Sequence, residues 1–505
     1  MVFNLIGVLI LTYLNLPALK KLFRRIKRKS WLILLAIVLM GLIVRVAFGP
    51  WAHIVYFDEY DYMQSAKWLV AEGRFGLCIT GSLEACQKFI LFPQQIGVSF
   101  LFSAVFFMAE ASSSSLMFLN LLINLASIAL VFCMGYLMLK RENSALFAAF
   151  VFSLVPIYVS YSTSAAPDII SVFLTFSALT MLFAYLESRS FRSLLLFSLV
   201  LAYALQTRTE NQMLILLAIL LFLMYGCVRV LWRKRSLMIL LVLLAAEFFA
   251  MMYVGNVLVN KEWIHRGPLS LSYIPKNSYY IYSWLSNVPF IFAIFTIIGI
   301  IMMIRSRKRF GRQGVFLGAW LLLYALVFMV YPYFKAERFT ISVFPPLVIL
   351  SGAGFGIMSF FRQDRLRKAA VFLLISISLL CFLSFIPKIT LPDPVLGDFW
   401  QETEFMRSLS LENGLIVAAH PGFVNFETGM SVIYIKDIEY IADKVNGGER
   451  VYFYHDLWCN DPIVGAYCKG IDKNFEMGLV EEREIRDNKI DNNKRVAIYE
   501  LVKVK

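Results

Sequence analysis

The chain has 505 residues, of which 59% are hydrophobic and only 16% charged, and its mean hydropathy is +0.70. This composition excludes an ordinary soluble protein of this length and predicts a membrane protein with many spans. The net charge of +14 does not indicate a nucleic-acid partner, because half of the 48 Lys and Arg residues fall in six short segments between apolar runs. Such segments are typical of cytoplasmic loops, so the basic charge indicates membrane orientation. They are residues 20–30, 140–142, 187–192, 229–235, 305–313 and 362–368.

The apolar runs predict about 11–12 transmembrane helices. Residues 2–18 are expected to form a first span with the N-terminus outside, because the positive charges follow this apolar run instead of preceding it as in a signal peptide. Residues 31–49 then cross outward, which places the loop 50–115 outside. Further spans are expected at 116–139, 144–161, 169–187, 193–209, 211–230, 237–259, 288–304, 314–331, 341–360 and 369–387.

The external loop is predicted to carry two surface helices. Residues 57–73 place apolar side chains at helical spacing, with Asp58 and Glu59 at the start, as in a helix that lies on a membrane surface. Residues 91–109 are apolar enough to span, but a crossing here would put every later basic segment outside. We therefore expect a second surface helix there.

The tail after Pro387 is charged and mixed in character. Short apolar runs at 415–419, 451–454 and 495–501 predict strands, and residues 423–429 and 437–445 predict helices. The expected fold is therefore a mainly α, polytopic membrane protein with a small extracytoplasmic α/β domain. Its expected parts are an N-terminal segment with a basic loop (1–30), a membrane domain (31–387) and the outer domain (388–505).

Two cysteine pairs lie in segments that the predicted topology places outside. Cys78 with Cys86, and Cys459 with Cys468, are close enough in sequence to form disulfides, and no nearby His or third Cys completes a zinc site. The sequence leaves the oxidation state of both pairs open.

Four stretches together resemble the GT-C superfamily of membrane glycosyltransferases. They are FDEYDYMQSAKWL in the first external loop, FPQQIGVSFLF after it, SAAPD ending at Asp168, and YFKAERFTISVFPPL at 333–347. In order and sidedness they are similar to protein O-mannosyltransferases and lipid A aminoarabinose transferases. The resemblance implies a polyprenyl-phosphate-linked sugar donor and transfer at the outer face to a protein, lipid or glycan acceptor.

The resemblance implies roles for the acidic residues of the outer face. Transfer needs a carboxylate that accepts the proton of the attacking hydroxyl or amine, and Asp58 is the candidate. Glu59 is the candidate to position this base, Asp61 is a weaker candidate, and Asp168 is a further site residue. Solvated acids at helix N-termini, and for Asp168 a helix cap, explain the same residues without chemistry. Asp58, Glu59 and Asp168 could hold a divalent cation, and the sequence leaves this open.

The leaving lipid phosphate needs cations, and basic residues are scarce on the outer side. Arg338 and Lys335 are candidates for phosphate contact, and Arg208 with Glu210 forms a second candidate pair at the outer boundary. Lys88 resembles a basic residue that some relatives place near the donor phosphate. Structural ion pairs or side chains that snorkel to the interface are the alternative interpretation.

Two other functions fit the composition less well. A transporter or flippase of lipid-linked or small polar substrates typically shows internal repeats and charged, broken spans near the bilayer centre. Here the acids and outer cations fall at one membrane face. An oligosaccharyltransferase subunit shares the superfamily, but its Trp-Trp-Asp signature is absent because the chain has no Trp-Trp pair.

Overall fold

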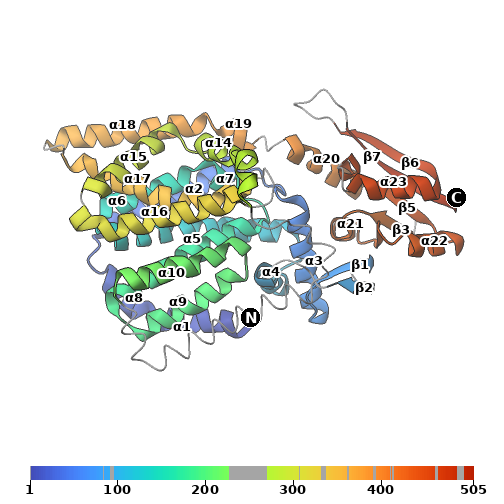
Figure 1. Cartoon of the computed structure of the whole chain (residues 1–505), viewed down its shortest axis with the longest axis horizontal. Coiled ribbons are helices and arrows are strands. Elements are labelled where there is room, and N and C mark those ends of the chain that lie inside the picture. Colours follow the sequence, from blue (N-terminus) through green and yellow to red (C-terminus); the bar gives the residue numbers. More distant parts are fainter. Residues whose placement is uncertain are drawn as a thin grey trace.

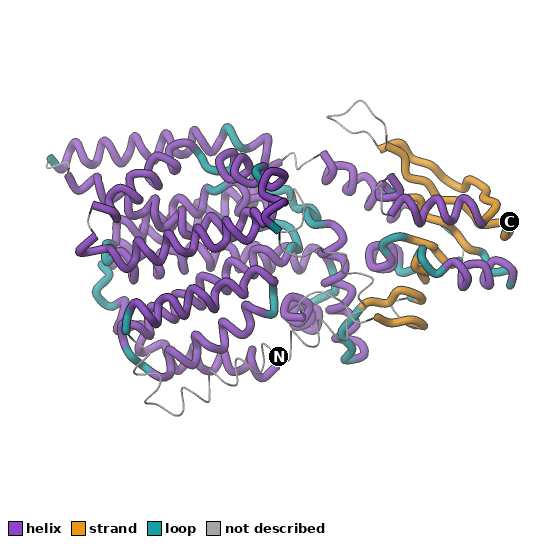
Figure 2. The backbone as a smooth tube through the Cα atoms, viewed as in Figure 1, coloured by secondary structure: helices purple, strands orange, loops and turns teal. Residues whose placement is uncertain are grey.

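The computed structural model shows a body of long helices joined to a smaller unit that contains a sheet (Figures 1 and 2). The described residues are 2–82, 85–90, 96–226, 270–305, 307–330, 337–360, 363–390, 394–409, 411, 414–460, 464–485 and 494–505. The span expected at 237–259 and the candidate Lys335 lie outside them.

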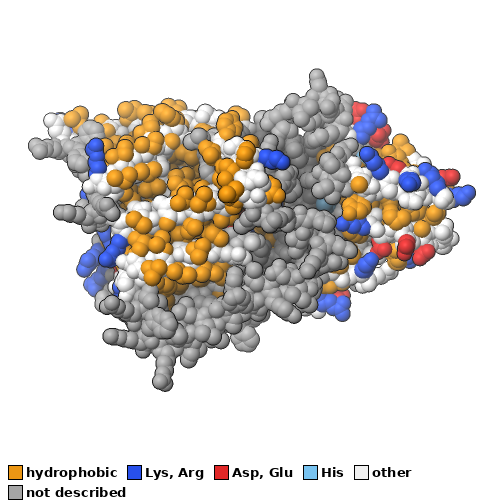
Figure 3. Space-filling model, in the orientation of Figure 1, with side chains coloured by type: hydrophobic (Ala, Val, Ile, Leu, Met, Phe, Trp, Pro, Cys, Tyr) orange, Lys and Arg blue, Asp and Glu red, His pale blue; other side chains and the backbone are white. Residues whose placement is uncertain are grey.

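Apolar helices build the body. Five of the described segments are long and apolar enough to cross a membrane, namely Arg28–Phe48, Ser113–Leu139, Pro167–Ser188, Gly311–Val330 and Thr340–Met358. Shorter apolar helices accompany them, and hydrophobic side chains are spread widely over the coloured part of the body in Figure 3. The predicted mainly helical, multi-pass fold is therefore confirmed.

The body helices have the following bounds: α1 Val2–Phe23, α2 Arg28–Phe48, α5 Ser113–Leu139, α6 Glu142–Leu154, α7 Pro156–Tyr161, α8 Pro167–Ser188, α9 Phe191–Leu205, α10 Met213–Met224, α15 Phe290–Arg305, α16 Arg307–Val330, α17 Phe344–Phe355 and α18 Asp364–Leu383. Short elements connect them: η1 Thr209–Gln212, η4 Leu271–Tyr273, α13 Ile274–Asn277, α14 Tyr279–Ser286, η5 Glu337–Val343, η6 Gly356–Phe360 and α19 Ile386–Thr390.

One predicted span is broken in the structure. The run 144–161 forms two helices, because Val155 is extended (φ −67°, ψ 120°) and Pro156 begins α7. Proline disfavours helical geometry at the residue before it and lacks the N–H that would continue the ladder. The polypeptide after this break, residues 162–166, leads directly into α8 and reaches the candidate site.

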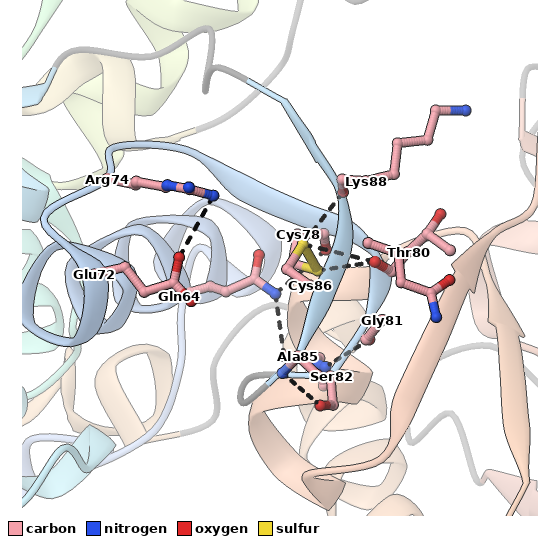
Figure 4. The surroundings of a disulfide bond; sticks show 12 residues. Gln64, Glu72, Arg74, Cys78, Thr80, Gly81, Ser82, Ala85, Cys86 and Lys88 are labelled. Atoms are coloured by element: carbon pink, nitrogen blue, oxygen red, sulfur yellow. Dashed lines mark hydrogen bonds and ion pairs between the residues drawn. A yellow bond between two sulfur atoms is a disulfide. The ribbon is translucent and has the colours of Figure 1, made fainter.

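The loop that was expected to be external folds into two helices and a hairpin. Helix α3 (Tyr56–Glu72) and helix α4 (Ile96–Met108) correspond to the two expected surface helices, and Gly73 ends α3 in the left-handed conformation (φ 67°). Between them, β1 (Leu77–Gly81) and β2 (Cys86–Ile90) form an antiparallel hairpin that the sequence reasoning missed. The Cys78–Cys86 disulfide joins its two strands (Figure 4).

The tail forms the sheet-containing unit, with α20 Pro394–Ser408, β3 Leu415–Ala418, α21 Pro421–Thr428, β4 Ser431–Tyr434, α22 Ile438–Asn446, β5 Val451–His455, η7 Leu457–Asn460, α23 Val464–Asn474, β6 Phe475–Ile485 and β7 Lys494–Val504. The predicted strands correspond to β3, β5 and β7, and the predicted helices to α21 and α22. The Cys459–Cys468 disulfide joins η7 to α23.

The hairpin and the tail share one seven-stranded sheet in the order β2-β1-β4-β3-β5-β7-β6. Strands β4, β3 and β5 are parallel, and the other pairs are antiparallel. The hairpin enters through β1, where Thr80 pairs with Ile433 and Gly81 with Val432. The sheet-containing unit therefore includes residues 77–90 as well as the tail, although the sequence predicted a unit made of 388–505 alone. Because the hairpin follows α3 in the chain, the shared sheet holds this unit beside α3.

Candidate active site

Glu59 anchors the start of α3. Its carboxylate is fully buried and lies 2.7 Å from His53 Nδ1. It also accepts hydrogen bonds from the backbone N–H groups of Ile54 (2.9 Å), Val55 (2.7 Å) and Ala165 (2.9 Å). These contacts join the polypeptide before α3 to the segment that leads into α8. Because both oxygens are engaged by nitrogen donors, Glu59 holds the architecture of the site.

Asp58, the neighbouring acid, points to a different partner. Its Oδ2 lies 2.5 Å from Arg338 Nη1, and both side chains are partly exposed, by 25% and 18%. Arg338 belongs to η5, just before α17, so the ion pair connects α3 to a distant part of the body. A guanidinium has five N–H donors, so Arg338 can hold Asp58 and still bind a second anion.

Arg208 forms a second ion-paired set near the start of α8 and the end of α9. Its Nη1 lies 3.0 Å from Asp168 Oδ1, and its Nε lies 2.5 Å from Glu210 Oε1. Asp168 falls in the first turn of α8, directly after Pro167, where a carboxylate is favoured by the helix dipole. The second oxygen of Asp168 has no hydrogen-bond partner among the described residues.

The two sets lie close enough to interact electrostatically. The charges of Asp58, Arg208 and Asp168 act on the Arg338 guanidinium. The charge of Asp58 acts on the Arg208 guanidinium as well. The structure therefore brings together five of the predicted site residues, Asp58, Asp168, Arg208, Glu210 and Arg338, from four segments of the chain. We call these five residues the charged cluster. Two largely buried guanidiniums can provide the positive charge and the N–H donors that stabilise an anionic leaving group.

Two further residues lie beside the charged cluster: Asp61, which the sequence marked only as a weaker candidate, and His420, which it did not mark. Asp61 lies one turn after Asp58 on α3, and burial together with the Asp58 charge raises its pKa well above the usual value. His420, directly before α21, interacts electrostatically with Asp58, and burial lowers its pKa to about 3. The spacing of three residues from Asp58 was the available signal for Asp61, since i and i+3 share a helix face. No local pattern marks His420.

Lys88 lies elsewhere. It is on β2, and its Nζ lies 2.5 Å from Asp437 Oδ2, so it fastens the hairpin to the start of α22. The structure thus does not bring Lys88 into the charged cluster.

The carboxylates do not assemble a metal site. Within the described ranges, no group of three or more His, Cys, Asp or Glu side chains is placed to hold a metal ion. Asp58 and Asp168 pair with arginines, and nitrogen donors occupy both oxygens of Glu59. This donor set does not fit a divalent cation.

Comparisons with known proteins identify the class of the fold. A family model described as dolichyl-phosphate-mannose-protein mannosyltransferase matches residues 94–253. ArnT from Cupriavidus metallidurans, crystallised with undecaprenyl phosphate, is similar with a TM-score of 0.61 and 13% identity over 94% of this chain and 98% of that chain. The oligosaccharyltransferase AglB from Archaeoglobus fulgidus, in complex with an inhibitory peptide and a dolichol-phosphate, is similar with a TM-score of 0.56 and 11% identity. That similarity covers 93% of this chain and 75% of the AglB chain.

No curated protein sequence matches the chain. The family model and the solved structures nevertheless confirm the resemblance that the sequence indicated: the chain has the fold of the GT-C superfamily of membrane glycosyltransferases. The similarity to ArnT extends over nearly the full length of both chains, including the sheet-containing unit.

Proposed function

We propose that the protein is a glycosyltransferase that moves a sugar from a polyprenyl-phosphate-linked donor to a hydroxyl or amine of an acceptor. The observation that carries the proposal is the Asp58–Arg338 ion pair beside the Arg208–Asp168 pair. It combines a carboxylate that can accept a proton with two guanidiniums that can bind a phosphate. The undecaprenyl phosphate in ArnT and the dolichol-phosphate in AglB support the class of donor.

In the proposed reaction, the acceptor oxygen or nitrogen forms a bond to the anomeric carbon of the sugar. The bond from that carbon to the phosphate oxygen breaks, and polyprenyl phosphate leaves with the electron pair. Asp58 takes the proton of the acceptor, which such general-base catalysis accelerates by about 10²- to 10⁴-fold. Arg338 and Arg208 stabilise the negative charge that grows on the phosphate.

The remaining acids of the charged cluster act as positioning residues in this proposal. Asp168 and Glu210 hold Arg208 from two sides, which restricts its guanidinium to one orientation. Glu59 holds the start of α3, and therefore Asp58, through contacts on both sides of the site. Because Arg208 and Asp58 are already held in place before the donor binds, less entropy is lost when they are ordered in the transition state.

The active site and the sheet-containing unit are proposed to lie outside the membrane. The basic segments between spans support this orientation, because they define the opposite, cytoplasmic face. The shared sheet supports it too, since the loop hairpin and the tail must lie on one side of the membrane to pair. The acceptor is then a protein, lipid or glycan of the cell envelope, and the protein resides in the cell membrane.

The function is tested with purified protein in nanodiscs, lipid-linked sugar extracted from envelopes, and an envelope fraction as acceptor. Radiolabelled sugar should leave the lipid fraction with wild-type protein and remain there with Asp58→Asn. A transporter would relocate the labelled lipid intact. Sugar that stays attached to its lipid with the wild-type protein would contradict the proposal.

A further inference from the structure

Helix α21 of the sheet-containing unit packs directly on α3. The Tyr60 ring lies 5.0 Å from the ring of Phe423 and 5.8 Å from that of Phe426, and the Tyr60 hydroxyl donates a hydrogen bond to Glu427. One turn further along α3, Gln64 Nε2 donates to Asn425 Oδ1 over 3.2 Å. Figure 1 shows α3 between the helical body and α21. The helix that carries Asp58 therefore has the charged cluster on one side and α21 on the other.

The hairpin reinforces this packing. Asn425 Nδ2 donates to the carbonyl of Gly81 on β1, and Gln64 Nε2 lies 3.5 Å from the carbonyl of Cys78. Figure 4 shows Gln64 extending from α3 toward the disulfide-closed strands. Because the position of α21 is fixed from both α3 and the hairpin, the residues at its start have defined places relative to Asp58.

Asp61 faces the start of α21. A Cβ atom at Gly422 would lie only 2.9 Å from Asp61 Oδ1, so the carboxyl is against the backbone of α21. No described residue forms a hydrogen bond or an ion pair with Asp61, although it is half-buried. The buried site and the neighbouring Asp58 charge raise its pKa. A carboxyl in this setting gains stability when a hydrogen-bond donor binds it.

His420 lies at the same end of α21, is partly buried with its Nε2 enclosed, and interacts electrostatically with Asp58. With a pKa of about 3, its imidazole is neutral at physiological pH. A neutral imidazole offers one nitrogen that donates and one that accepts. His420 thus adds hydrogen-bonding capacity next to Asp58 without adding charge.

These groups suit a ligand different from the lipid phosphate. Neither Asp61 nor a neutral His420 contributes positive charge, whereas an anionic phosphate is better met by the two guanidiniums of the charged cluster. A hydroxyl or an amine, by contrast, donates to a carboxylate or to an imidazole nitrogen. We call the place where Asp61 faces Gly422, two residues after His420, the α3–α21 seam.

We propose that the α3–α21 seam binds the acceptor, with Asp61 and His420 holding its nucleophilic hydroxyl or amine beside Asp58. The proposal deepens the glycosyltransferase function and rests on it. Asp58 then stands between the donor phosphate at the guanidiniums and the acceptor at the seam. The sheet-containing unit is therefore a part of the active site that selects the acceptor.

The test separates acceptor binding from donor binding. Undecaprenyl phosphate serves as the probe of the donor side, with its affinity measured in nanodiscs. Transfer of labelled sugar from extracted lipid-linked donors to increasing amounts of a heat-inactivated envelope fraction gives the half-saturating acceptor amount. The variants are Asp61→Asn, which keeps the side-chain shape, and His420→Ala. His455→Ala is the matched control, because His455 lies in the same unit but on β5, with its ring against Phe453.

We expect Asp61→Asn and His420→Ala to raise the half-saturating acceptor amount by about 10- to 100-fold, as the loss of hydrogen bonds to a charged or buried partner implies. Their affinity for undecaprenyl phosphate should stay within about twofold of wild type, and His455→Ala should change neither value. Unchanged acceptor dependence in both variants, or weakened undecaprenyl phosphate binding, would overturn the seam assignment. If wild-type protein neither binds undecaprenyl phosphate nor transfers sugar, the proposed function itself is wrong and the assignment falls with it.

A variant that fails to fold does not support the proposal, so the unfolding temperature of each is compared with wild type. Gly422→Val provides a second approach, because its side chain would enter the space next to Asp61 Oδ1 while both polar side chains remain. We expect the same rise in the half-saturating acceptor amount. Normal acceptor dependence in a folded Gly422→Val protein would contradict the assignment.

Discussion

The Asp58 carboxylate and the Arg338 guanidinium meet at 2.5 Å although 280 positions separate them in the chain. Asp58 is held by the first turn of α3, and Arg338 by η5 before α17. In the proposed mechanism, this pairing places the proton acceptor next to a phosphate-binding group.

Replacing Asp58 with Asn should lower transfer by at least about 10²-fold, because the amide cannot accept the proton of the acceptor. Folding should be retained, since Asn keeps the size of the side chain. The check is the rate of labelled-sugar transfer together with the unfolding temperature. Asp472→Asn, at an exposed position on α23, serves as the control with normal activity. Near-normal turnover of Asp58→Asn would show that another group is the base.

Replacing Arg338 with Ala should raise the donor concentration needed for half-maximal transfer by about 10-fold or more, because a charge-assisted contact to the phosphate is lost. Arg338→Lys should restore activity only in part, since Lys lacks the planar set of donors that can serve Asp58 and the phosphate together. The measurement is transfer at varied donor and fixed acceptor. If the rate of transfer depends on donor concentration as it does in the wild type, the ion pair of Arg338 with Asp58 is only structural.

Glu59 should behave differently from its neighbour Asp58. Glu59→Ala leaves buried N–H groups of Ile54, Val55 and Ala165 without their acceptor, and each such group costs about 1–3 kcal/mol. We expect a clear fall in the unfolding temperature and poor recovery of folded protein. A Glu59→Ala protein as stable as wild type but inactive would instead support direct participation of Glu59 in catalysis.

The His420 environment predicts acid sensitivity. The folded state lowers the pKa of His420 from 6.5 to about 3, so folding disfavours its protonation. Stability from this residue is fully present above pH 6.5 and is lost as the pH falls toward 3. The unfolding temperature of wild type should therefore drop between pH 6.5 and 4 more steeply than that of His420→Gln. Parallel curves for the two proteins would contradict a buried, neutral His420.

The orientation of the protein can be tested by cysteine labelling in intact cells. Lys473→Cys, exposed at the end of α23, should react with a membrane-impermeant maleimide. Lys29→Cys, exposed in the basic segment at the start of α2, should react only after the membrane is permeabilised. The opposite pattern would invert the proposed topology and place the charged cluster in the cytoplasm.

The sequence predicted the elements that local patterns determine. Hydropathy located most of the body helices, and α3 was marked by apolar residues at helical spacing. Alternation and turn signals located β3, β5 and β7. The sequence predicted one span over 144–161, although the break at Pro156 could have been predicted, because helical geometry is disfavoured at the residue before a proline. The helix expected at 91–109 is present as α4 (Ile96–Met108), and its position on the membrane surface stays a prediction.

What the sequence could not predict depends on distant partners. The pairing of Thr80 with Ile433 joins the hairpin to the tail across most of the chain, and no local signal specifies it. The candidate acids and arginines were identified by residue type and sidedness, but only the structure shows that Lys88 pairs with Asp437 while Arg208 joins Asp168. His420 comes close to Asp58 because α21 packs on α3.

The most direct test of the central claim is mass spectrometry of the lipids that co-purify with Asp58→Asn, with Arg338→Ala as the comparison. We predict that Asp58→Asn retains a polyprenyl-phosphate-linked sugar, because the donor binds but its sugar is not transferred. Arg338→Ala should retain much less of it, because its phosphate contact is lost. Bulk phospholipid alone in both variants, from membranes shown to contain lipid-linked sugars, would contradict the claim that the charged cluster binds such a donor.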